Sequence, residues 1–265
     1  MSGRLVICPT PIGNLGDLTL RVLDALRSAD VIACEDTRQT QKLLARHGID
    51  ARLEPYHEHN ERRRAHELVR RIERGEVVAL VSDAGTPLVS DPGYLLVRAC
   101  VDAGLPVEVL PGPTAAITAL VASGLPADRF RFRGFLPRRR GELERELADA
   151  AETLVAYESP RRLAATLALL AEIDPERPVA VARELTKVHE EVVRGTAAEL
   201  ARRFAGGTRG EVVLVVGPAA ADAEARADLE QARAAVERLV EAGARRRAAA
   251  QTVSSLTGLP ANRLY

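Results

Sequence analysis

The stretch VVALVSDAGTPLVSDPG, residues 77–93, carries the clearest indication of fold and function in this chain. Its first five residues are continuously apolar, as in a strand buried on both faces of a parallel sheet. The twelve residues from Ser82 to Gly93 combine small, turn-forming and carboxylate side chains. Glycines let a ligand approach the backbone closely, and prolines reduce the entropy lost on binding. A loop that only connected two elements would not need this composition at this length, so we predict that it binds a ligand.

Strand-like and helix-like segments alternate on both sides of this loop. Apolar β-rich runs predict strands at Arg4–Cys8, Val31–Cys34, Val77–Val81 and Val107–Leu110. Helical spacing and C-terminal glycines predict helices at Asp17–Ser28, Thr37–His47, Glu61–Arg74, Tyr94–Ala103 and Thr114–Ser123. This alternation favours a mostly parallel sheet with helices on both faces.

A second α/β unit follows, and we place the boundary between the two lobes near Pro113. Its predicted strands are Phe130–Phe135, Thr153–Tyr157, Val179–Arg183, Glu190–Gly195 and Glu211–Val216. Its predicted helices are Glu142–Ala151, Arg161–Ile173 and Ala197–Phe204. In the first of these strands the phenylalanines at 130 and 132 alternate with arginines, so we expect the two rings in the core.

Three regions result: an N-terminal lobe at 1–113, a C-terminal lobe at 114–219 and a tail at 220–265. After Gly217 the composition shifts to alanine and charge, which is typical of a linker. Residues 229–265 predict three short helices, broken at Gly243 and at Gly258–Pro260. We interpret them as a small helical module, with the helix-turn-helix type as one possibility.

The composition is that of a folded protein without a strong overall charge. Its 265 residues are 46% hydrophobic and 28% charged, with a formal net charge of zero, so any RNA contact must come from local patches. Of the 37 basic residues only Lys42 and Lys187 are lysines. The three cysteines lie in apolar stretches without ligand spacing, which suits a reducing cytoplasm. We expect no secretory signal, and no stretch approaches the ~20 apolar residues of a membrane span.

Two further loops join a predicted strand to a helix. In an open α/β sheet, binding and catalytic groups gather beyond the C-terminal ends of the strands. The loop PTPIGNLGD, residues 9–17, has two prolines and two glycines, and either Asp17 or Thr19 can cap the next helix. In the loop PGPTAA, residues 111–116, Thr114 can do the same. Each loop alone is also compatible with a rigid turn.

The strings TPIGNLGDLTLR, ACEDTR, SDAGTPLVSDPG, PGPTA, YESPRR and RELTKVHEE resemble one enzyme family. It is the ribosomal RNA small subunit methyltransferase I family, a branch of the tetrapyrrole methylase superfamily. The resemblance covers about Arg4 to Gly217 and is looser in the tail. It implies a two-lobed tetrapyrrole-methylase-like fold, S-adenosylmethionine in the cleft between the lobes, and 2′-O-methylation of a decoding-centre cytidine of 16S rRNA. A homodimer is expected by analogy with the superfamily.

The resemblance also assigns cofactor-binding residues by motif. They are Pro11 and Ile12 in the first loop, Gly85, Thr86 and Val89 in the second, and Thr114 and Ala115 in the third. Thr86 stands where the superfamily usually has aspartate, so Asp83 or Asp91 is the expected source of a carboxylate contact.

Two clusters are candidates for catalysis. A ribose hydroxyl is a poor nucleophile, so a base, or a cation beside the developing alkoxide, would help methyl transfer. Lys187 with Glu184 is one candidate, and the alternative is an ordinary ion pair at a strand end. Glu35 with Asp36 is the other, and the alternative is an acidic helix N-terminus favoured by the helix dipole. In YESPRR, Ser159 is placed to cap a helix that starts at Pro160.

Exposed arginines are the candidates for RNA contact. Phosphate binding is predicted for Arg38, Arg131, Arg133, Arg138, Arg139, Arg140 and Arg161. The alternative for a chain so rich in arginine is a solvated surface. The aromatic residues are few, so we expect the substrate base to be held by shape and polar groups rather than by stacking.

The remaining signals leave two other functions open. His57 and His59 bracket Glu58, but no further ligand cluster is near in sequence, and we predict no metal site. A methyltransferase acting on a small tetrapyrrole-like molecule is one alternative function, although the prolines of the first loop argue against it. A non-catalytic RNA-binding factor that retains the cofactor is the other.

Overall fold

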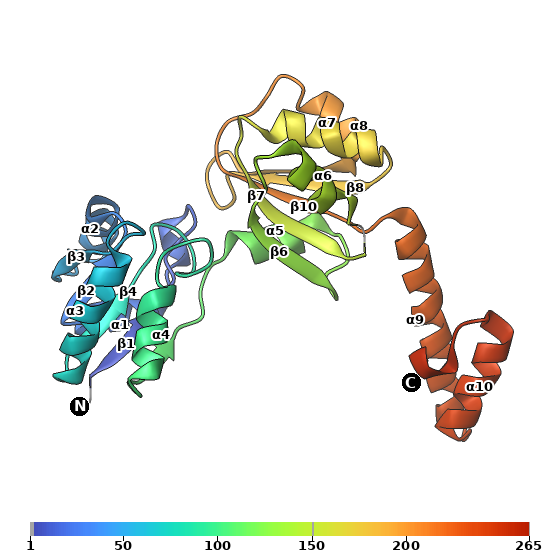
Figure 1. The fold of residues 1–265 in the computed structure, drawn as a ribbon, viewed down its shortest axis with the longest axis horizontal. Coiled ribbons are helices and arrows are strands. Elements are labelled where there is room, and N and C mark those ends of the chain that lie inside the picture. The colour runs from blue at the N-terminus through green and yellow to red at the C-terminus, as the bar shows by residue number, and fades with distance from the viewer. Residues whose placement is uncertain (1–2, 150, 265) are drawn as a thin grey trace.

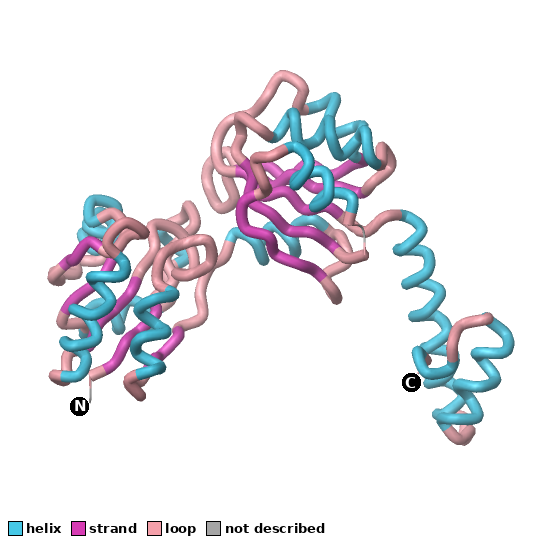
Figure 2. Tube along the Cα trace, in the orientation of Figure 1, coloured by secondary structure: helices cyan, strands magenta, loops and turns pink. Residues whose placement is uncertain are grey.

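The computed structural model describes residues 3–149 and 151–264. It contains two separate five-stranded sheets, followed by a helical tail that extends away from them (Figure 1). We call the first sheet and its helices the first lobe, and the second sheet and its helices the second lobe. Most of the long loops of the first lobe lie on the side that faces the second lobe (Figure 2).

The first sheet is entirely parallel, with the order β3-β2-β4-β1-β5. Its strands are β1 (Arg4–Ile7), β2 (Val31–Cys34), β3 (Leu53–Pro55), β4 (Val77–Leu80) and β5 (Val107–Val109). Helices α1 (Leu20–Ser28) and α2 (Thr37–Arg46) cover one face, and α3 (Glu61–Glu73) and α4 (Tyr94–Asp102) cover the other. The prediction for this lobe is confirmed with two differences. The helix predicted from Asp17 begins at Leu20, after the 3₁₀ helix η1 (Leu15–Asp17), and the three-residue edge strand β3, of sequence Leu-Glu-Pro, was not predicted.

The second sheet has the order β6-β7-β10-β8-β9. Only β6 and β7 are parallel, and the other three pairs are antiparallel. Its strands are β6 (Phe130–Phe135), β7 (Thr153–Glu158), β8 (Pro178–Arg183), β9 (Glu191–Thr196) and β10 (Val212–Val216). The expectation of a mostly parallel sheet therefore does not extend to this lobe. A parallel pair needs a crossover of a dozen or more residues, whereas only residues 184–190 join β8 to β9.

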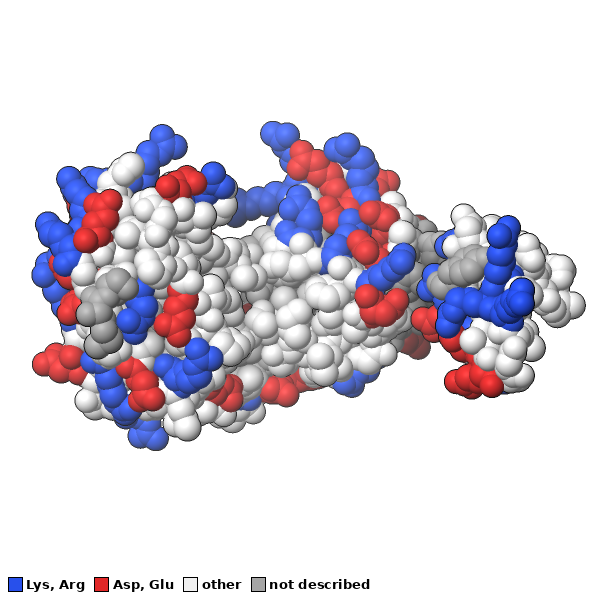
Figure 3. Space-filling view, turned by 90° about the horizontal axis from the view of Figure 1, so that it is seen from below, with Lys and Arg blue, Asp and Glu red and all other residues white. Residues whose placement is uncertain are grey.

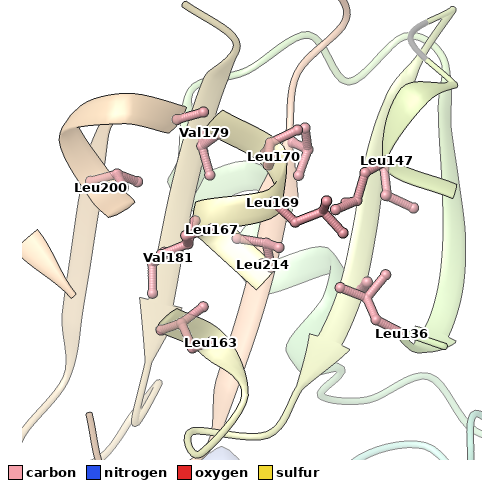
Figure 4. Close-up of a cluster of buried hydrophobic side chains, with 14 of the residues drawn as sticks. Leu136, Leu147, Leu163, Leu167, Leu169, Leu170, Val179, Val181, Leu200 and Leu214 are labelled. Atoms are coloured by element: carbon pink, nitrogen blue, oxygen red, sulfur yellow. The ribbon is translucent and has the colours of Figure 1, made fainter. Parts of the chain in front are cut away.

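Helices also cover both faces of the second sheet. Helices α6 (Arg140–Ala148), α7 (Leu163–Ile173) and α8 (Ala197–Arg203) enclose the larger core on one face. Figure 4 shows the leucines of α7 lying over Val181 and Leu214 of the sheet. On the other face α5 (Ala115–Ser123) packs through Ala116, Ala119 and Leu120.

Strand β6 contains an irregularity that later determines the shape of the site. Phe132 pairs with Val155 and Phe135 with Tyr157, so three steps along β6 match two along β7. The extra residue is a β-bulge, and Gly134 within it has a φ of 69°. Phe132 packs against the core as expected, but Phe130 is 37% exposed, so its assignment to the core is wrong.

The side chains predicted to cap three helices behave differently. Thr19 caps α1, its hydroxyl accepting the Val22 N–H at 3.2 Å. Thr114 precedes α5 without a capping hydrogen bond from its side chain. Helix α7 starts at Leu163 rather than at Pro160, and the Ser159 carbonyl accepts the first N–H groups of this helix. The Ser159 hydroxyl therefore does not have the predicted capping role.

The tail consists of α9 (Ala220–Glu241), α10 (Arg246–Thr257) and the 3₁₀ helix η2 (Ala261–Arg263). The segment predicted as a linker is helical from Ala220, because alanine has the highest helix propensity and charged residues are compatible with a solvated helix. The breaks at Gly243 and Gly258 are confirmed. A small core of its own, including Val236 and Val253, holds α9 against α10. In the described part of the chain, no helix is long and apolar enough to cross a membrane.

Candidate active site

Hydrogen bonds join the three loops for which the sequence predicts ligand binding, residues 9–17, 82–93 and 111–116. Thr10 and Gly85 exchange two backbone hydrogen bonds, of 2.8 and 3.0 Å. The Thr10 hydroxyl donates to the Ser82 carbonyl at 2.9 Å, and the Thr86 hydroxyl donates to the Pro113 carbonyl at 3.0 Å. The three loops are adjacent because the strands before them, β4, β1 and β5, are neighbours in the sheet. Together with these hydrogen bonds, this arrangement makes the loops one rigid surface.

The second loop has a strained backbone. Leu88 and Ser90 have φ values of 73° and 70°, which non-glycine residues rarely adopt, and Gly85 has 84°. Strain of this kind persists only where the surrounding structure enforces it, and it clusters at ligand sites. A Cβ atom at Gly85 would lie 3.3 Å from Ile12, so a side chain here would crowd the first loop.

A cavity of about 460 Å³ lies between the lobes. From the first lobe and the start of α5 it is lined by Ile12, Ala84, Gly85, Thr86, Val89, Ser90, Asp91, Thr114 and Ala115. From the second lobe it is lined by Phe135, Tyr157, Glu158, Ser159, Pro160, Ala182, Leu185, Gly210, Glu211, Val212 and Val213. All the predicted cofactor-binding residues thus reach the cavity except Pro11, which is buried behind Ile12, and Asp83.

Carboxylates gather at the first-lobe side of this cavity. Burial, then the charges of Glu35 and Asp83, raise the pKa of Asp91 to about 6. Burial and neighbouring carboxylates also raise the pKa of Glu35 and of Asp83. Asp36 instead has a structural role, because its carboxylate accepts the Arg38 N–H at 2.8 Å and caps α2. The concentration of negative charge favours a cationic ligand.

The other predicted pair belongs to the loop between β8 and β9. The Lys187 ammonium donates to Glu184 at 3.0 Å and to Glu211 at 2.9 Å. Burial alone would lower the pKa of Lys187, but these hydrogen bonds outweigh it and raise the pKa. Lys187 is therefore protonated at neutral pH and is unsuited to accept a proton. In the described residues, no hydrogen bond or ion pair links this pair to Glu35 or Asp36.

This loop touches the first loop of the other lobe. Glu184 and Thr186 have left-handed φ values of 50° and 67°. A Cβ atom at Gly13 would lie 2.6 Å from the Lys187 Cγ and 2.9 Å from the Leu185 carbonyl oxygen. Only glycine permits this close approach, which holds the two sides of the cavity together.

The seven predicted RNA-binding arginines fall into two groups. Arg131 and Arg133 both pair with Glu146, while Arg139 pairs with Glu142 and Arg140 with Glu172. The other three, Arg38, Arg138 and Arg161, are exposed, and within residues 3–149 and 151–264 their guanidinium groups have no hydrogen bond or ion pair. These three are the ones free to bind a phosphate.

Residues that the sequence analysis did not single out also line the cavity. Phe135 and Tyr157 supply two aromatic rings, and Glu158 is buried, accepting the Thr166 hydroxyl at 2.7 Å and pairing with Arg162 at 3.3 Å. The strings YESPRR and RELTKVHEE marked two of these segments. Phe135 had no such signal, because its orientation depends on the bulge in β6. In the described residues, no group of three or more histidine, cysteine, aspartate or glutamate side chains could hold a metal ion.

Comparison with known proteins agrees with this geometry. The sequence profile of the tetrapyrrole (corrin/porphyrin) methylases matches residues 4–201. The ribosomal RNA small subunit methyltransferase I of Micromonospora olivasterospora is 48% identical over 272 residues, covering 100% of this chain and 86% of that protein. The chain belongs to the tetrapyrrole methylase family, in its ribosomal RNA small subunit methyltransferase I branch. The family resemblance inferred from the motifs is thereby confirmed.

Solved structures of the tetrapyrrole methylase family share the fold. The methyltransferase CobJ is 25% identical, with a TM-score of 0.62 over 83% of this chain and 95% of that one. Uroporphyrin-III C-methyltransferase from Thermus thermophilus, complexed with S-adenyl homocysteine, is 23% identical, with a TM-score of 0.56 over 81% of this chain and 97% of that one. The two-lobed α/β fold class is confirmed.

Proposed function

We propose that this protein transfers a methyl group from S-adenosylmethionine to the 2′-hydroxyl of a decoding-centre cytidine in 16S rRNA. The observation that carries the proposal is the cavity between the lobes, which the three family loops line together. The relative named ribosomal RNA small subunit methyltransferase I, alike over the whole chain, supports rRNA as the substrate. The ribose position and the cytidine come from the family resemblance.

The cavity suits the cofactor in size and charge. Its volume of about 460 Å³ lies in the range of ligand pockets, about 300–1,000 Å³. When bound, S-adenosylmethionine supplies an activated methyl group on a positively charged sulfonium. Asp91 lines the cavity without a cationic partner in the described residues, and Asp83 and Glu35 lie near it. We propose that Ile12, Gly85, Thr86, Val89, Thr114 and Ala115 hold the cofactor, with Asp91 facing its charge, Asp83 adding to the negative field and Pro11 supporting Ile12.

The chain's own groups can prepare the ribose hydroxyl. Glu35 remains our candidate to accept its proton, because a raised pKa brings the carboxylate closer to the working pH. Asp36 is less suited, since its carboxylate caps a helix. We propose that Lys187 and Glu184 act by positioning, because their ion pair fixes Glu211 at the cavity wall. Most of the rate enhancement would then come from alignment of the reacting groups.

RNA contact is proposed for the second lobe and the edge of the first. Arg138, Arg161 and Arg38 are exposed and unpaired in the described residues, so they are the first candidates to bind phosphates. The other four predicted arginines would each have to break an existing ion pair before binding a phosphate; they are Arg131, Arg133, Arg139 and Arg140.

We also propose a homodimer. Helix α5 is apolar around its whole circumference, yet only one face is buried, leaving Ile117 and Val121 exposed by 42% and 73%. In the first lobe, Val109 on the edge strand β5 and Tyr94 on α4 are 62% and 66% exposed. A broad uncharged area also crosses the middle of one face of the molecule (Figure 3). Analytical ultracentrifugation tests this: V121E should produce monomers.

Two further assignments remain proposals. We place the division between the lobes near Pro113, supported by the packing of α5 against the second sheet. We propose a cytoplasmic location, supported by three free, buried cysteines and by the rRNA substrate.

The decisive experiment is methyl transfer from labelled S-adenosylmethionine to small ribosomal subunits isolated from cells lacking this gene, with mapping of the label. We expect label on a single ribose 2′-hydroxyl near the decoding centre. Cofactor binding without transfer to subunits or rRNA would overturn the proposal. Transfer to a small tetrapyrrole, or no transfer to any acceptor, would then identify the small-molecule enzyme or the non-catalytic factor.

A further inference from the structure

The bulge in β6 gives Phe135 an orientation that regular alternation would not. In an unbroken strand, residues 132 and 135 face opposite sides of the sheet. The extra residue brings both onto the same side, and both rings pack edge-to-face against Tyr157, with centroid separations of 5.1 and 5.5 Å. Gly134 permits the bulge, and a Cβ atom there would lie 3.1 Å from the Ser90 hydroxyl of the second loop. The bulge thus directs the Phe135 ring toward the cavity.

Phe135 lines the cavity and is nevertheless 63% exposed. A phenylalanine so exposed gains little from burial, and it does not belong to the hydrophobic core, whereas Phe132 beside it packs against that core. Its ring therefore lies at the mouth of the cavity, where it can be covered by a molecule that enters from solution.

Two unpaired arginines lie on the loops beside this ring. Arg138 follows Phe135 in the loop to α6, and Arg161 follows the cavity-lining Pro160 in the loop to α7. The Arg162 guanidinium ties these loops together, donating to the Leu136 and Pro137 carbonyls at 3.2 and 2.5 Å. An exposed ring with two guanidinium groups on a fixed framework matches a nucleotide, whose base stacks and whose phosphates bind arginine.

We propose that Phe135, supported by Tyr157, is the stacking platform for the base of the nucleotide that is methylated. This replaces the expectation, based on the small number of aromatic residues, that shape and polar groups rather than stacking hold the base; the exposed ring at the cavity is the reason. This inference rests on the proposed function and names the substrate subsite within the same cavity. The cofactor also has an aromatic base and a carboxylate, but it has no phosphate. Its cationic sulfonium is matched by Asp91, which lines the first-lobe side of the cavity.

Steady-state kinetics with unmethylated small subunits tests the proposal. Loss of stacking on one base corresponds to about a tenfold or larger change in affinity. We therefore expect F135A to raise KM for subunits by about tenfold and to leave the affinity for S-adenosylhomocysteine, measured by calorimetry, within about twofold. F135L should show the same defect while keeping apolar volume, and F135W should restore a low KM. F130A is the matched control, since Phe130 is an exposed ring on the same strand outside the cavity lining.

A second readout does not depend on activity. The chain contains no tryptophan, so the F135W variant has a single tryptophan, at the cavity mouth, which can be excited at wavelengths where tyrosine does not absorb. A cytidine-containing single-stranded oligoribonucleotide should quench its fluorescence, and the same oligonucleotide should leave that of F130W unchanged. A wild-type KM in F135A or F135L would overturn the proposal, as would a loss of S-adenosylhomocysteine affinity, which would place the ring in the cofactor's site. Absence of methyl transfer by the wild-type protein would instead refute the proposed function.

Discussion

The two lobes present different kinds of side chain to the same cavity. The first lobe supplies rigid loops of small residues, together with carboxylates whose pKa values are raised by burial. The second lobe supplies an aromatic pair and the carboxylates of Glu158 and Glu211 to the lining, and carries the unpaired Arg138 and Arg161 on loops outside it. The aromatic rings and the unpaired arginines thus come from one lobe, and the strained loops of small residues from the other. Because each lobe has its own sheet, the residues on one side of the cavity are positioned independently of those on the other side.

The contact between the lobes should give the largest effect. G13V places a branched side chain where even a Cβ atom would lie 2.6 Å from the Lys187 Cγ. Overpacking costs about 1–3 kcal/mol, and a shift of about 1 Å between reacting groups can cost about 100-fold in rate. We expect kcat/KM to fall by about 100-fold and S-adenosylhomocysteine binding to weaken. G206V is the control, since a Cβ atom at Gly206 meets nothing within 4 Å. Unchanged binding and rate in G13V would show that this contact does not shape the cavity.

The arginines of the second lobe should give the next largest effect. Removing the unpaired Arg138 and Arg161 together should raise KM for small subunits by about tenfold. The slope of log KM against the logarithm of the salt concentration should also become shallower, by about 0.7 for each lost contact to a single-stranded phosphate. R139A/R140A removes the same charge from the paired arginines of α6 and is the matched control. Equal defects in the two double variants would contradict the distinction between paired and unpaired arginines.

Asp91 tests the charge on the first-lobe side. Above its pKa of about 6 the carboxylate is ionised and attracts a sulfonium. S-adenosylmethionine affinity should therefore fall several-fold as the pH drops through about 6, and D91N should lose the same several-fold at pH 7.5. The uncharged thioether of S-adenosylhomocysteine provides the control ligand, whose affinity should change little. Equal losses for both ligands would mean that Asp91 does not recognise the positive charge.

The ionised Asp91 carboxylate favours binding of the cofactor, but it destabilises the folded protein when no ligand is bound. A carboxyl whose folded-state pKa is raised must ionise in the folded protein against burial and its neighbours, while the unfolded chain ionises freely. Ionisation of Asp91 therefore lowers the free energy of unfolding above its folded-state pKa of about 6. This destabilisation disappears as the pH falls toward the ordinary carboxyl pKa of about 4. D91N should therefore raise the Tm of the ligand-free protein at pH 7.5 by a few degrees, which corresponds to a gain on the order of 1 kcal/mol in the free energy of unfolding. A lower Tm would contradict the raised pKa.

Lys187 should give the smallest effect. Because its ammonium is held by Glu184 and Glu211 and its pKa is raised, K187R should keep the ion pairs and retain activity within about twofold. K187M, which removes the charge, should lose activity several-fold by releasing the loop beside the cavity. An inactive K187R with an intact fold would instead indicate that the lysine takes part in proton transfer.

The first lobe could be predicted closely because its signals are local. Val31–Cys34 is apolar throughout, and the predicted strand matches β2 at both ends. The second lobe was harder, since strand direction depends on how chains cross over the sheet. The antiparallel pairing of β8 with β9 is not visible in their sequences. Likewise, Thr114 has a capping side chain but no capping bond, because side-chain geometry is decided by tertiary contacts.

The two α/β units, the three strand-to-helix loops and the family could be read from residue types at short spacing. Only the tertiary structure decided which side chains meet. It assigned Lys187 to an ion pair, separated free arginines from paired ones, and showed through one extra residue in β6 that Phe135 faces the cavity. Such facts depend on contacts between residues far apart in the chain, and a single-residue shift in register reverses which side of a sheet a side chain faces.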